Sequence, residues 1–541
     1  MNTRRPATPD ADATAPEIDT AMLASTDSAP SPLTPWWGAV AGLVAGAVAV
    51  TIGMLVAGII EVVSPIDAVG STFIDHVPAW LKELAIRWFG TNDKFALRVG
   101  IVIVLFIASL VLGALTVRRR RVGLIGIAAF GVVGAWAAIS RPAEPGSAWL
   151  PSIVGAIAGA VLLSALVNRH PDATPIETPG PSRVPLGWDR RRFLVTSGLA
   201  TAAAATAGTV AQALERSRVA KIERAIPDAL PASSGTSTLT IPAAATLDAE
   251  VPYITPNESF YRIDTALSFP RVDPTSWKLT IGGMVDQTLS LSYDDLLART
   301  QVERIVTLTC VSNEVGGKYI GNAVWQGVLL KDLLDEAGVQ AGVEQLFSTS
   351  LDGWTCGFPV AVATDGRDAM VALGMNGEAL PLAHGFPARL VVPGLYGYVS
   401  ATKWLDSIEL TTWDQATGYW VPRGWAREAP VKTHSRIDLP KRGADLAAGP
   451  VKLAGIAWAQ HRGIERVEVR VDNGEWMEAT LAADVTDDSW RPWAVEWQAT
   501  AGRHSVQVRA TDKTGATQTE EVRPPAPDGA TGYHTRTFDI A

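Results

Sequence analysis

Long apolar runs alternate with short polar segments through the first 215 residues of the chain. The runs have few or no charges and lie at residues 36–60, 95–117, 122–139, 149–167 and 193–214. Each comes close to or exceeds the roughly 20 residues that a helix needs to cross the hydrocarbon core of a bilayer. The pattern predicts an all-α membrane domain of about five transmembrane helices. The fifth run is largely alanine and threonine and is the least hydrophobic.

Further along the chain, the apolar positions change to the two-residue period of β-strands. Residues 277–281 alternate apolar and polar side chains and are followed by two glycines, which predicts a strand and a turn. Val306, Leu308 and Cys310 alternate with threonines in the same way. This second segment predicts a strand whose apolar face ends in a thiol, followed by a polar turn with two glycines.

Two short helices are predicted between the strands. Ser292 can cap a helix over residues 293–299, and leucines recur on one face of residues 329–337 before Gly338 stops the helix. Strands mixed with short helices indicate an α+β domain over residues 257–430.

The C-terminal segment consists almost entirely of alternating patterns. Apolar and polar residues alternate at 467–472, 493–497 and 506–510, and Asp-Asn-Gly at 472–474 is a strong hairpin signal. Half-buried strands with turns at this spacing predict an all-β, immunoglobulin-like sandwich over residues 431–541.

These patterns divide the chain into six parts. They are a disordered tail rich in Pro, Ala, Thr, Asp and Ser (1–35), a four-helix transmembrane domain (36–168), a cytoplasmic loop with the fifth transmembrane helix (169–215), a Pro/Ala/Ser-rich linker with a short helix near 218–225 (216–256), the α+β domain (257–430) and the sandwich (431–541).

Basic residues orient the predicted membrane helices. If five helices alternate across the bilayer, one side receives Arg4, Arg5, Arg118 to Arg121, Arg169 and Arg190 to Arg192. Cytoplasmic loops accumulate Lys and Arg, so this side is assigned to the cytoplasm. The loop 61–94 and everything after residue 214 then lie on the other side. We expect a multi-pass protein of the cell membrane, in contact with lipid, whose soluble part is extracytoplasmic.

The fifth helix opens with the sequence DRRRFL at residues 189–194. This resembles a twin-arginine export signal, in which paired arginines, Phe and Leu precede a weakly hydrophobic helix. Such a signal implies a protein that folds, often around a cofactor, before it is exported. The alternative is an ordinary basic flank on the cytoplasmic side. That alternative does not explain why this helix is less hydrophobic than the other four.

The net charge and the absence of several common motifs argue against some frequent functions. The formal net charge is -9 and no basic stripe with interleaved aromatics occurs, so no nucleic-acid partner is expected. The sequence has no CxxC, HExxH, Walker or GxSxG motif. Its two cysteines are Cys310 and Cys356. Cys310 can anchor a metal or cofactor, form a buried core thiol, or pair with Cys356 in a structural disulfide.

Several short motifs follow one another at defined spacings in the second half of the chain. They read NESFY (257–261), the strand ending at Cys310, GNAVWQGV (321–328), MNGEALP (375–381), HGFPARLVVPG (384–394) and KW (403–404). In this order they resemble the sulfite oxidase family of molybdopterin enzymes, over residues 251–541. The C-terminal sandwich is similar to the dimerisation domain of that family, which implies a homodimer.

The resemblance implies a molybdenum–molybdopterin cofactor whose metal is bound by Cys310. A soft, anionic thiolate suits a thiophilic metal of high valence. The residues implied to bind the pterin are Asn257, Tyr261, Arg262, His384, Arg389, Ser400 with the backbone to Thr402, and Lys403. Arg389 is the preferred clamp for the pterin phosphate, because guanidinium offers planar bidentate donors. A surface salt bridge is the alternative for this residue.

The catalytic residues implied are Cys310, Arg262 and Tyr419. By resemblance Tyr419 hydrogen-bonds the reactive oxygen, although core packing explains a tyrosine there equally well. The family usually has paired basic residues after the asparagine of the cysteine motif, where this chain has Glu314 and Val315. Two charges expected to bind sulfite are thus missing there, and Arg262, Arg423 and Arg427 remain as candidates to bind an anion.

We expect no haem in this chain, because it has no CxxCH and the predicted membrane helices contain no histidine. His76 is placed in an outer loop. Electrons would pass to or from a separate partner protein. The expected function is two-electron oxygen-atom transfer on a small substrate, as in sulfite oxidation or sulfoxide reduction. The alternative is a catalytically silent membrane sensor or assembly scaffold that retains the fold.

Overall fold

The computed structural model describes residues 33–78, 81, 84, 88–89, 92–141, 144–167, 190–227, 230–233, 240–248 and 250–541. Residues 1–32 of the predicted tail and the predicted cytoplasmic loop up to residue 189 lie outside the described residues, as does the first residue of the DRRRFL motif.

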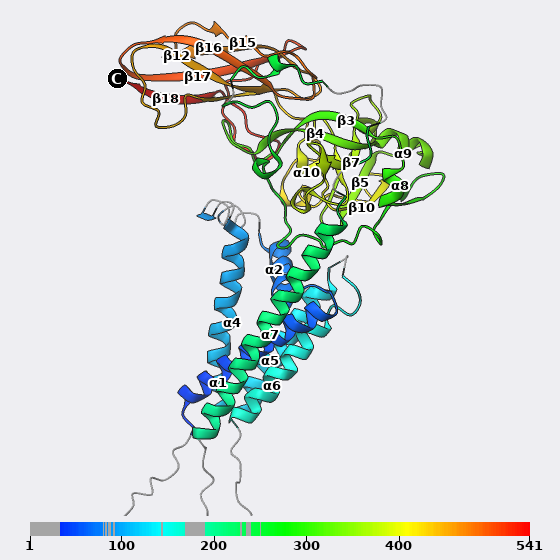
Figure 1. Cartoon of the computed structure of the whole chain (residues 1–541), viewed down its shortest axis with the longest axis vertical. Helices are drawn as coiled ribbons and strands as arrows, with labels where there is room; N and C mark the ends of the chain where they lie inside the picture. The colour runs from blue at the N-terminus through cyan, green and yellow to red at the C-terminus, as the bar shows by residue number, and fades with distance from the viewer. Residues whose placement is uncertain are drawn as a thin grey trace, which may run out of the picture.

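Five helices are long and apolar enough to cross a membrane (Figure 1). They are α1 (Pro35–Ile59), α4 (Asp93–Arg118), α5 (Arg120–Ile139), α6 (Leu150–Val167) and α7 (Arg190–Ala225). All five lie where the apolar runs predict them. Small residues allow close packing: a Cβ added to Gly42 of α1 would lie 2.1 Å from the carbonyl oxygen of Ser109 on α4.

Two features of this bundle differ from the sequence-based expectation. α7 continues without a break to Ala225, past the predicted end at residue 215, so the predicted short linker helix is its last part. A further helix, α2 (Pro65–His76), lies in the predicted loop 61–94. Ser64 caps α2 by accepting a hydrogen bond from the backbone N–H of Asp67 (3.1 Å). His76 is therefore the last residue of a helix that lies within the predicted loop between two of the long apolar helices.

The α+β domain is built on two five-stranded sheets. The first has the order β2-β1-β10-β5-β6, and the second has the order β3-β4-β7-β8 with β9 paired to β7. Their strands are β1 (Lys278–Gly283), β2 (Leu289–Ser292), β3 (Val302–Thr309), β4 (Ile320–Leu329), β5 (Gln345–Ser350), β6 (Thr355–Pro359), β7 (Met370–Met375), β8 (Glu378–Ala379), β9 (Arg389–Val391) and β10 (Leu405–Thr411). Strand β4 is buried along almost its whole length because β3 and β7 flank it.

The short helices of this domain begin and end close to their predicted bounds. α8 (Tyr293–Leu297) starts at Ser292, which forms a reciprocal capping box with Asp295. α9 (Leu330–Ala337) ends at Gly338, whose φ of 69° is the left-handed conformation that glycine adopts without strain. A third helix, α10 (Gly397–Ser400), follows β9.

The C-terminal segment forms two four-stranded sheets, ordered β11-β12-β16-β15 and β14-β13-β17-β18. The strands are β11 (His434–Leu439), β12 (Gly449–Trp458), β13 (Ile464–Val471), β14 (Met477–Glu478), β15 (Thr480–Leu481), β16 (Arg491–Ala499), β17 (Gly502–Asp512) and β18 (His534–Ile540). Buried residues of both sheets, such as Val467, Trp493 and Val508, share one core. After β13, Asp472 and Asn473 have positive φ as the predicted hairpin turn requires.

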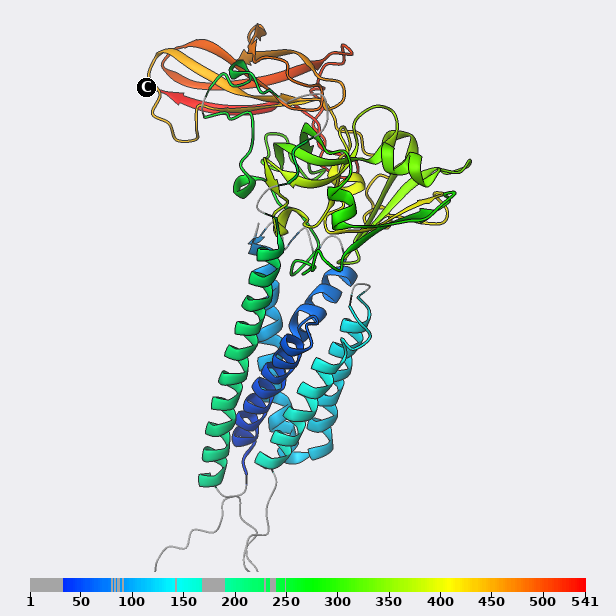
Figure 2. The same ribbon diagram turned by 45° about the vertical axis from the view of Figure 1, so that its right-hand side comes forward.

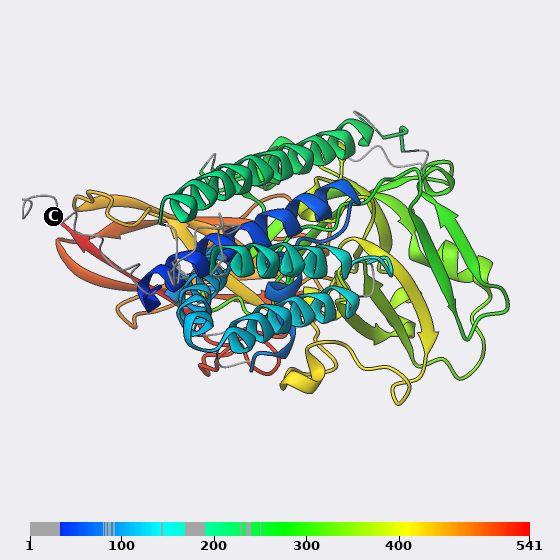
Figure 3. The same ribbon diagram turned by 90° about the horizontal axis from the view of Figure 1, so that it is seen from below.

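The α+β domain sits on the end of the helical bundle at which α2 lies (Figure 2). Three arginines donate to backbone carbonyl oxygens across this junction: Arg98 to Leu267 (3.1 Å), Arg141 to Asp352 (2.8 Å) and Arg423 to Asp75 (2.9 Å). The opposite end of the bundle carries the α4–α5 connection and the start of α7. Seen from that end, the helices lie in front of the soluble domains (Figure 3).

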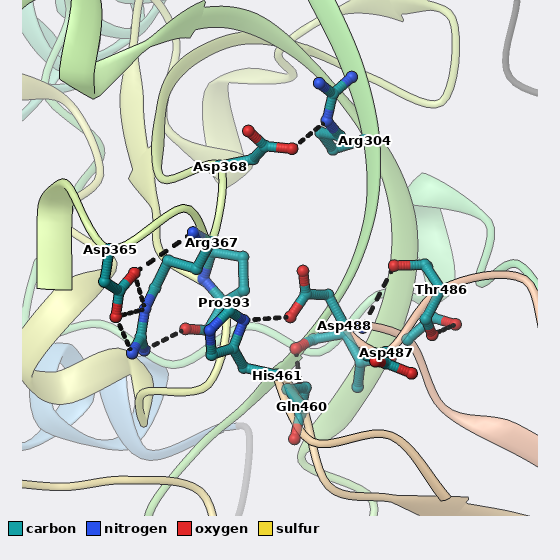
Figure 4. Close-up of polar contacts among 12 residues, drawn as sticks. Arg304, Asp365, Arg367, Asp368, Pro393, Gln460, His461, Thr486, Asp487 and Asp488 are labelled. Atoms are coloured by element: carbon teal, nitrogen blue, oxygen red, sulfur yellow. Dashed lines mark hydrogen bonds and ion pairs between the residues drawn. The ribbon is translucent and has the colours of Figure 1, made fainter. Parts of the chain in front are cut away.

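Several polar contacts lie where the α+β domain meets the C-terminal domain (Figure 4). Arg367 binds the carboxylate of Asp365 and donates from Nη1 to the carbonyl oxygen of Pro393 (2.9 Å). His461 Nδ1 lies 3.5 Å from Oδ1 of Asp488. Burial raises the pKa of Asp488 to about 6, although His461 opposes the shift.

The C-terminal domain covers the outer edge of β3. The strand order leaves β3 at the end of its sheet. The backbone N–H of Thr307 donates to the carbonyl oxygen of Asp488 (2.9 Å), and Nε2 of Gln460 donates to the carbonyl oxygen of Thr307 (2.9 Å). The backbone N–H of Trp490 donates to the Thr307 hydroxyl (2.7 Å). The strand that leads to Cys310 is thus held on both sides.

Candidate active site

Cys310 is the first residue after β3, at the start of a tight turn. Its backbone N–H donates to the carbonyl oxygen of Tyr319 (3.0 Å), and its own carbonyl oxygen accepts from the N–H of Asn313 (3.0 Å). The side-chain oxygen of Asn313 accepts from the N–H of Tyr319 (2.8 Å), which closes the turn. The thiol is buried, and burial raises its pKa although hydrogen bonds from Ser312 lower it. An ionised thiol at this position therefore needs a positive partner, such as a metal ion.

Both cysteines are free thiols. Cys356 lies on β6, where its sulfur contacts the hydroxyl groups of Thr402 (3.1 Å) and Ser348 (3.4 Å). The disulfide that the sequence left open is not formed, and Cys310 remains available as a ligand.

A cavity of about 270 Å³ opens at Cys310 and shares several lining residues with a larger cleft of about 1080 Å³. The residues shared by the two linings are Lys94, Phe260, Tyr261, Ile263, Asp264 and His384. Of the residues predicted to bind a cofactor, the Cys310 cavity is lined by Cys310, Tyr261, His384, Arg389 and Lys403, and the cleft by Asn257, Tyr261, Arg262 and His384. The fold brings these segments together although they are up to about 150 residues apart in sequence.

Arg389 supplies a buried positive charge to the cavity. Its side chain lies over the ring of Trp325 (4.8 Å), and Nη1 donates to the carbonyl oxygen of His384 (3.2 Å). Only 5% of the residue is exposed, and burial lowers the pKa of the guanidinium to about 10. Among the described residues, no carboxylate lies within ion-pair distance of it. The surface salt bridge considered from the sequence is therefore absent, and the arrangement suits a bound anion.

A second buried cluster centres on Asp264, a residue that the sequence analysis did not single out. Its carboxylate contacts the ammonium groups of Lys403 (2.8 Å) and Lys94, and Arg262 lies 3.6 Å away. Burial alone would raise the pKa of Asp264, but the two lysines outweigh it and hold the pKa at about 2. Burial lowers the pKa of Lys403 to about 8 against the opposing effect of Asp264. Because Lys94 belongs to α4, this cluster joins the helical bundle to the cavity.

His384 and Asn257 provide neutral hydrogen-bonding groups. Nε2 of His384 lies 2.8 Å from the carbonyl oxygen of Asn257, so Nε2 carries the proton. Burial lowers the pKa of His384 to about 4, which keeps the ring neutral at physiological pH. The Asn257 side chain accepts from Nδ2 of Asn376 (2.7 Å) and donates to Glu378. The NESFY, MNGEALP and HGFPAR motifs thus hold one another in place.

Two predicted site residues have their polar groups engaged elsewhere. Ser400 is fully buried and donates to the carbonyl oxygen of Tyr396 (3.1 Å), the residue before α10. The Tyr419 hydroxyl donates to Asp75 of α2 (3.3 Å), and Tyr419 is not among the residues that line the Cys310 cavity. Tyr398 lines it instead, and its hydroxyl donates to the carbonyl oxygen of Ala426 (2.6 Å).

The arginines considered for a substrate anion are also dispersed. The Arg262 side chain is 43% exposed and stacks on Phe269 (4.8 Å) at the cleft. Arg423 stacks on the ring of Tyr419 (3.7 Å), and Arg427 lies over Trp413 (4.7 Å). Neither Arg423 nor Arg427 lines the Cys310 cavity.

The donor set itself restricts what can bind here. Within the part of the chain that the structure describes, no three His, Cys, Asp or Glu side chains converge on a common point. A metal at Cys310 would therefore take most of its ligands from a non-protein group. The buried cations, neutral imidazole and amide groups around the adjoining cleft suit an anionic organic molecule with several hydrogen-bonding atoms. These residues fit a metal carried by an organic cofactor.

Comparison with known proteins identifies the class. Residues 266–420 match the family described as "Oxidoreductase molybdopterin binding domain". Mouse mitochondrial sulfite oxidase is 30% identical over 321 residues, which cover 50% of this chain and 58% of the relative. An uncharacterized oxidoreductase of Bacillus subtilis, YuiH, is 35% identical over 153 residues, or 28% of this chain and 74% of the relative. The α+β domain is thus a molybdopterin-binding oxidoreductase domain.

The chain belongs to the sulfite oxidase family of molybdopterin oxidoreductases, as the order of its sequence motifs predicts. The cofactor of this family, molybdenum–molybdopterin, is its cofactor. The matched region spans little more than half the length of the mouse enzyme. The solved structure of the sulfane dehydrogenase SoxCD from Paracoccus pantotrophus aligns with 59% of this chain and 92% of its own chain, at 23% identity and a TM-score of 0.47.

Proposed function

We propose that the protein is a membrane-anchored, extracytoplasmic oxidoreductase that transfers an oxygen atom between water and a small substrate X. In the reducing direction the reaction is XO + 2 e⁻ + 2 H⁺ → X + H₂O, and the oxidising direction is its reverse. The observation that carries this proposal is the free, buried thiol of Cys310 at a cavity that also contains buried cations. When bound, the molybdenum centre supplies the two-electron redox chemistry.

The surrounding side chains bind and orient the cofactor and the substrate. We assign the metal–thiolate bond to Cys310 and the pterin phosphate to Arg389, whose buried charge has no carboxylate partner among the described residues. Lys403, which is paired with Asp264, lines the same cavity and is assigned to the phosphate as a second cation. The neutral His384 and Asn257 hydrogen-bond the pterin at the cleft. Tyr261 and the backbone after Ser400 complete its surroundings, and Arg262 at the rim attracts an anionic group. The Tyr419 hydroxyl contacts Asp75 of α2, so it can hydrogen-bond the reactive oxygen only if α2 moves away.

Metal content tests this function directly. We expect protein purified from a host that makes the cofactor to contain stoichiometric molybdenum and to turn over a sulfoxide, nitrate or sulfite with a redox dye. Molybdenum would be measured by elemental analysis, and a variant with Asn257→Ala in the cleft would contain less. Protein that is folded and contains no molybdenum would favour the silent sensor or scaffold.

The orientation is supported by the arrangement of the bundle. The basic segments at residues 118–121 and 190–192 lie at the end opposite the α+β domain (Figure 2). If that end is cytoplasmic, the active site is outside the cytoplasm. The separate electron partner would then reach the active-site domain from the extracytoplasmic side or from the membrane.

Export of the folded domain gives a second test. Replacing Arg191 and Arg192 by lysine keeps the charge but removes the twin-arginine pair, so the α+β domain should remain in the cytoplasm. Protease protection in spheroplasts would show this change. The matched control is Arg120→Lys with Arg121→Lys, which should leave export unchanged. External exposure that persists in the Arg191/Arg192 variant would refute a twin-arginine role.

The strand order of the C-terminal domain supports the assignment of a homodimer. Its strand order, β11-β12-β16-β15 against β14-β13-β17-β18, corresponds to the A-B-E-D and C′-C-F-G sheets of an immunoglobulin-like sandwich. By resemblance to the family's dimerisation domain, we assign a homodimer contact to this unit.

A further inference from the structure

The cavity at Cys310 is not enclosed by the α+β domain alone. Phe73 and Ile74 of α2, Val77 directly after it, and Lys94 and Leu97 of α4 also line it. Lys94 and Leu97 are three residues apart and therefore share one face of α4. The helical bundle thus contributes one wall of the active-site cavity.

Specific contacts fix this wall to the α+β domain. Lys94 forms an ion pair with Asp264, and Arg141 donates to the carbonyl oxygen of Asp352 (2.8 Å). Both aspartates line the cavity themselves. The position of the wall is therefore set by contacts at the site and does not follow merely from the connection of the two domains.

Most of the surface that lines the cavity at Cys310 is apolar. Besides the bundle residues, it contains Trp354, Tyr398, Trp420 and Trp425 of the α+β domain. A small, strongly hydrated anion would gain little from so many apolar and aromatic side chains. A molecule with an apolar body would gain free energy from each methylene group that it buries.

Exposed aromatic residues mark the same end of the bundle. Trp88 is 70% exposed and Phe95 is 69% exposed, and both flank the start of α4. Aromatic side chains gather at this level where a membrane helix meets the lipid headgroups. Figure 1 shows α2 at the end of the bundle next to the α+β domain. With the five helices in a bilayer, the residues of α2 and α4 that line the cavity would lie at the membrane surface.

We propose that this cavity binds an amphiphile from the membrane interface, with its polar, oxygen-bearing head toward Cys310 and its apolar body between α2, α4 and the tryptophans. This inference rests on the proposed function, whose substrate class it narrows. The wall formed by Val77 and Leu97 sets how long an apolar body the site accepts.

Photolabelling of the full-length, detergent-solubilised holoenzyme tests the inference without relying on turnover. The probe is hexyl methyl sulfoxide carrying a diazirine in its alkyl chain, and labelled peptides are mapped by mass spectrometry. We expect labels on α2 near Val77 and on the segment 420–425. Dimethyl, propyl methyl and hexyl methyl sulfoxide then compete with the probe. The half-protecting concentration should fall by about two- to fourfold per added methylene.

Two tryptophan variants separate this site from non-specific adsorption. Val77→Trp fills the apolar end and should raise the half-protecting concentration of hexyl methyl sulfoxide at least tenfold. Val132→Trp, on the exposed face of α5, should behave as the unchanged protein. Circular dichroism and molybdenum content show whether each variant is folded and loaded.

The outcomes distinguish the two proposals. Protection that is independent of chain length, or equal in the two variants, overturns the amphiphile site even if the enzyme contains molybdenum and reduces dimethyl sulfoxide. Protein without molybdenum that still binds the probe with the expected chain-length dependence overturns the enzymatic function and leaves the amphiphile site standing.

Discussion

Replacing Cys310 by serine is expected to lower turnover by more than about 100-fold, because changing even an outer partner of a metal ligand costs 10–100-fold in affinity or activity. Serine is a harder ligand, and its hydroxyl is far less acidic than a thiol, so it does not supply the soft anionic sulfur that molybdenum prefers. Dye-linked turnover would be measured together with molybdenum content and the sulfur-to-metal charge-transfer absorption. Loss of that absorption marks a change at the metal and not a general loss of folding.

Cys356→Ser is the matched control for this experiment. Cys356 is also buried, with 1% of the residue exposed against 8% for Cys310. Its sulfur already contacts two hydroxyl groups, so a serine there can make similar hydrogen bonds. The variant should keep its molybdenum, its absorption and most of its turnover. Equal losses in the two variants would show that the effect comes from removing any buried thiol, and the ligand assignment to Cys310 would be wrong.

Replacing Asp264 by asparagine is expected to destabilise the junction of bundle and α+β domain by about 3–5 kcal/mol, since the buried ammonium group of Lys403 loses the carboxylate that it contacts. Lys403 would lose its 2.8 Å contact, and Lys94 of α4 would lose its ion pair with Asp264. A lower thermal unfolding midpoint and faster proteolysis at the junction would report the change. The control is Asp528→Asn, which removes a half-exposed ion pair with Lys432. The expected loss in the free energy of unfolding is below about 1 kcal/mol.

The same carboxylate gives the stability a defined pH dependence. The pKa of Asp264 is about 2 in the folded protein and 3.8 ordinarily, so the folded state favours the ionised form. The resulting stabilisation of about 2 kcal/mol is fully present above pH 4 and is lost as the pH falls through 2. Unfolding measured over this range should show that loss in the unchanged protein and not in Asp264→Asn. An identical acid profile in both would contradict the assignment.

The elements that sequence predicts best here are those set by local pattern. Run length predicts the five long helices, and the reciprocal cap of Ser292 and the left-handed Gly338 follow from side-chain chemistry within one turn. The short α2 is too short and too polar to register as a membrane span. The end of α7 was misplaced because its last ten residues turn polar while remaining helical.

The site was predictable where contiguous motifs supply its residues. Cys310, His384 and Arg389 meet at one cavity as the motif order implies. Asp264 carries no motif, and its partner Lys94 lies 170 positions away on another domain, so only the tertiary structure pairs them. Tyr419 was placed by resemblance alone, and its contact with Asp75 comes from a helix whose position the sequence does not reveal.

The contacts of Thr307 with the C-terminal domain have a consequence for any shortened form of the protein that lacks this domain. β3 is an edge strand, and an uncovered edge offers its backbone N–H and C=O groups to any passing strand of another molecule. Gln460 and Asp488 occupy those groups at Thr307, three residues before Cys310. A shortened chain that ends at residue 430 would present that edge to solvent. The C-terminal domain therefore prevents the β3 edge from pairing with strands of other molecules and so favours solubility, in addition to any role in assembly.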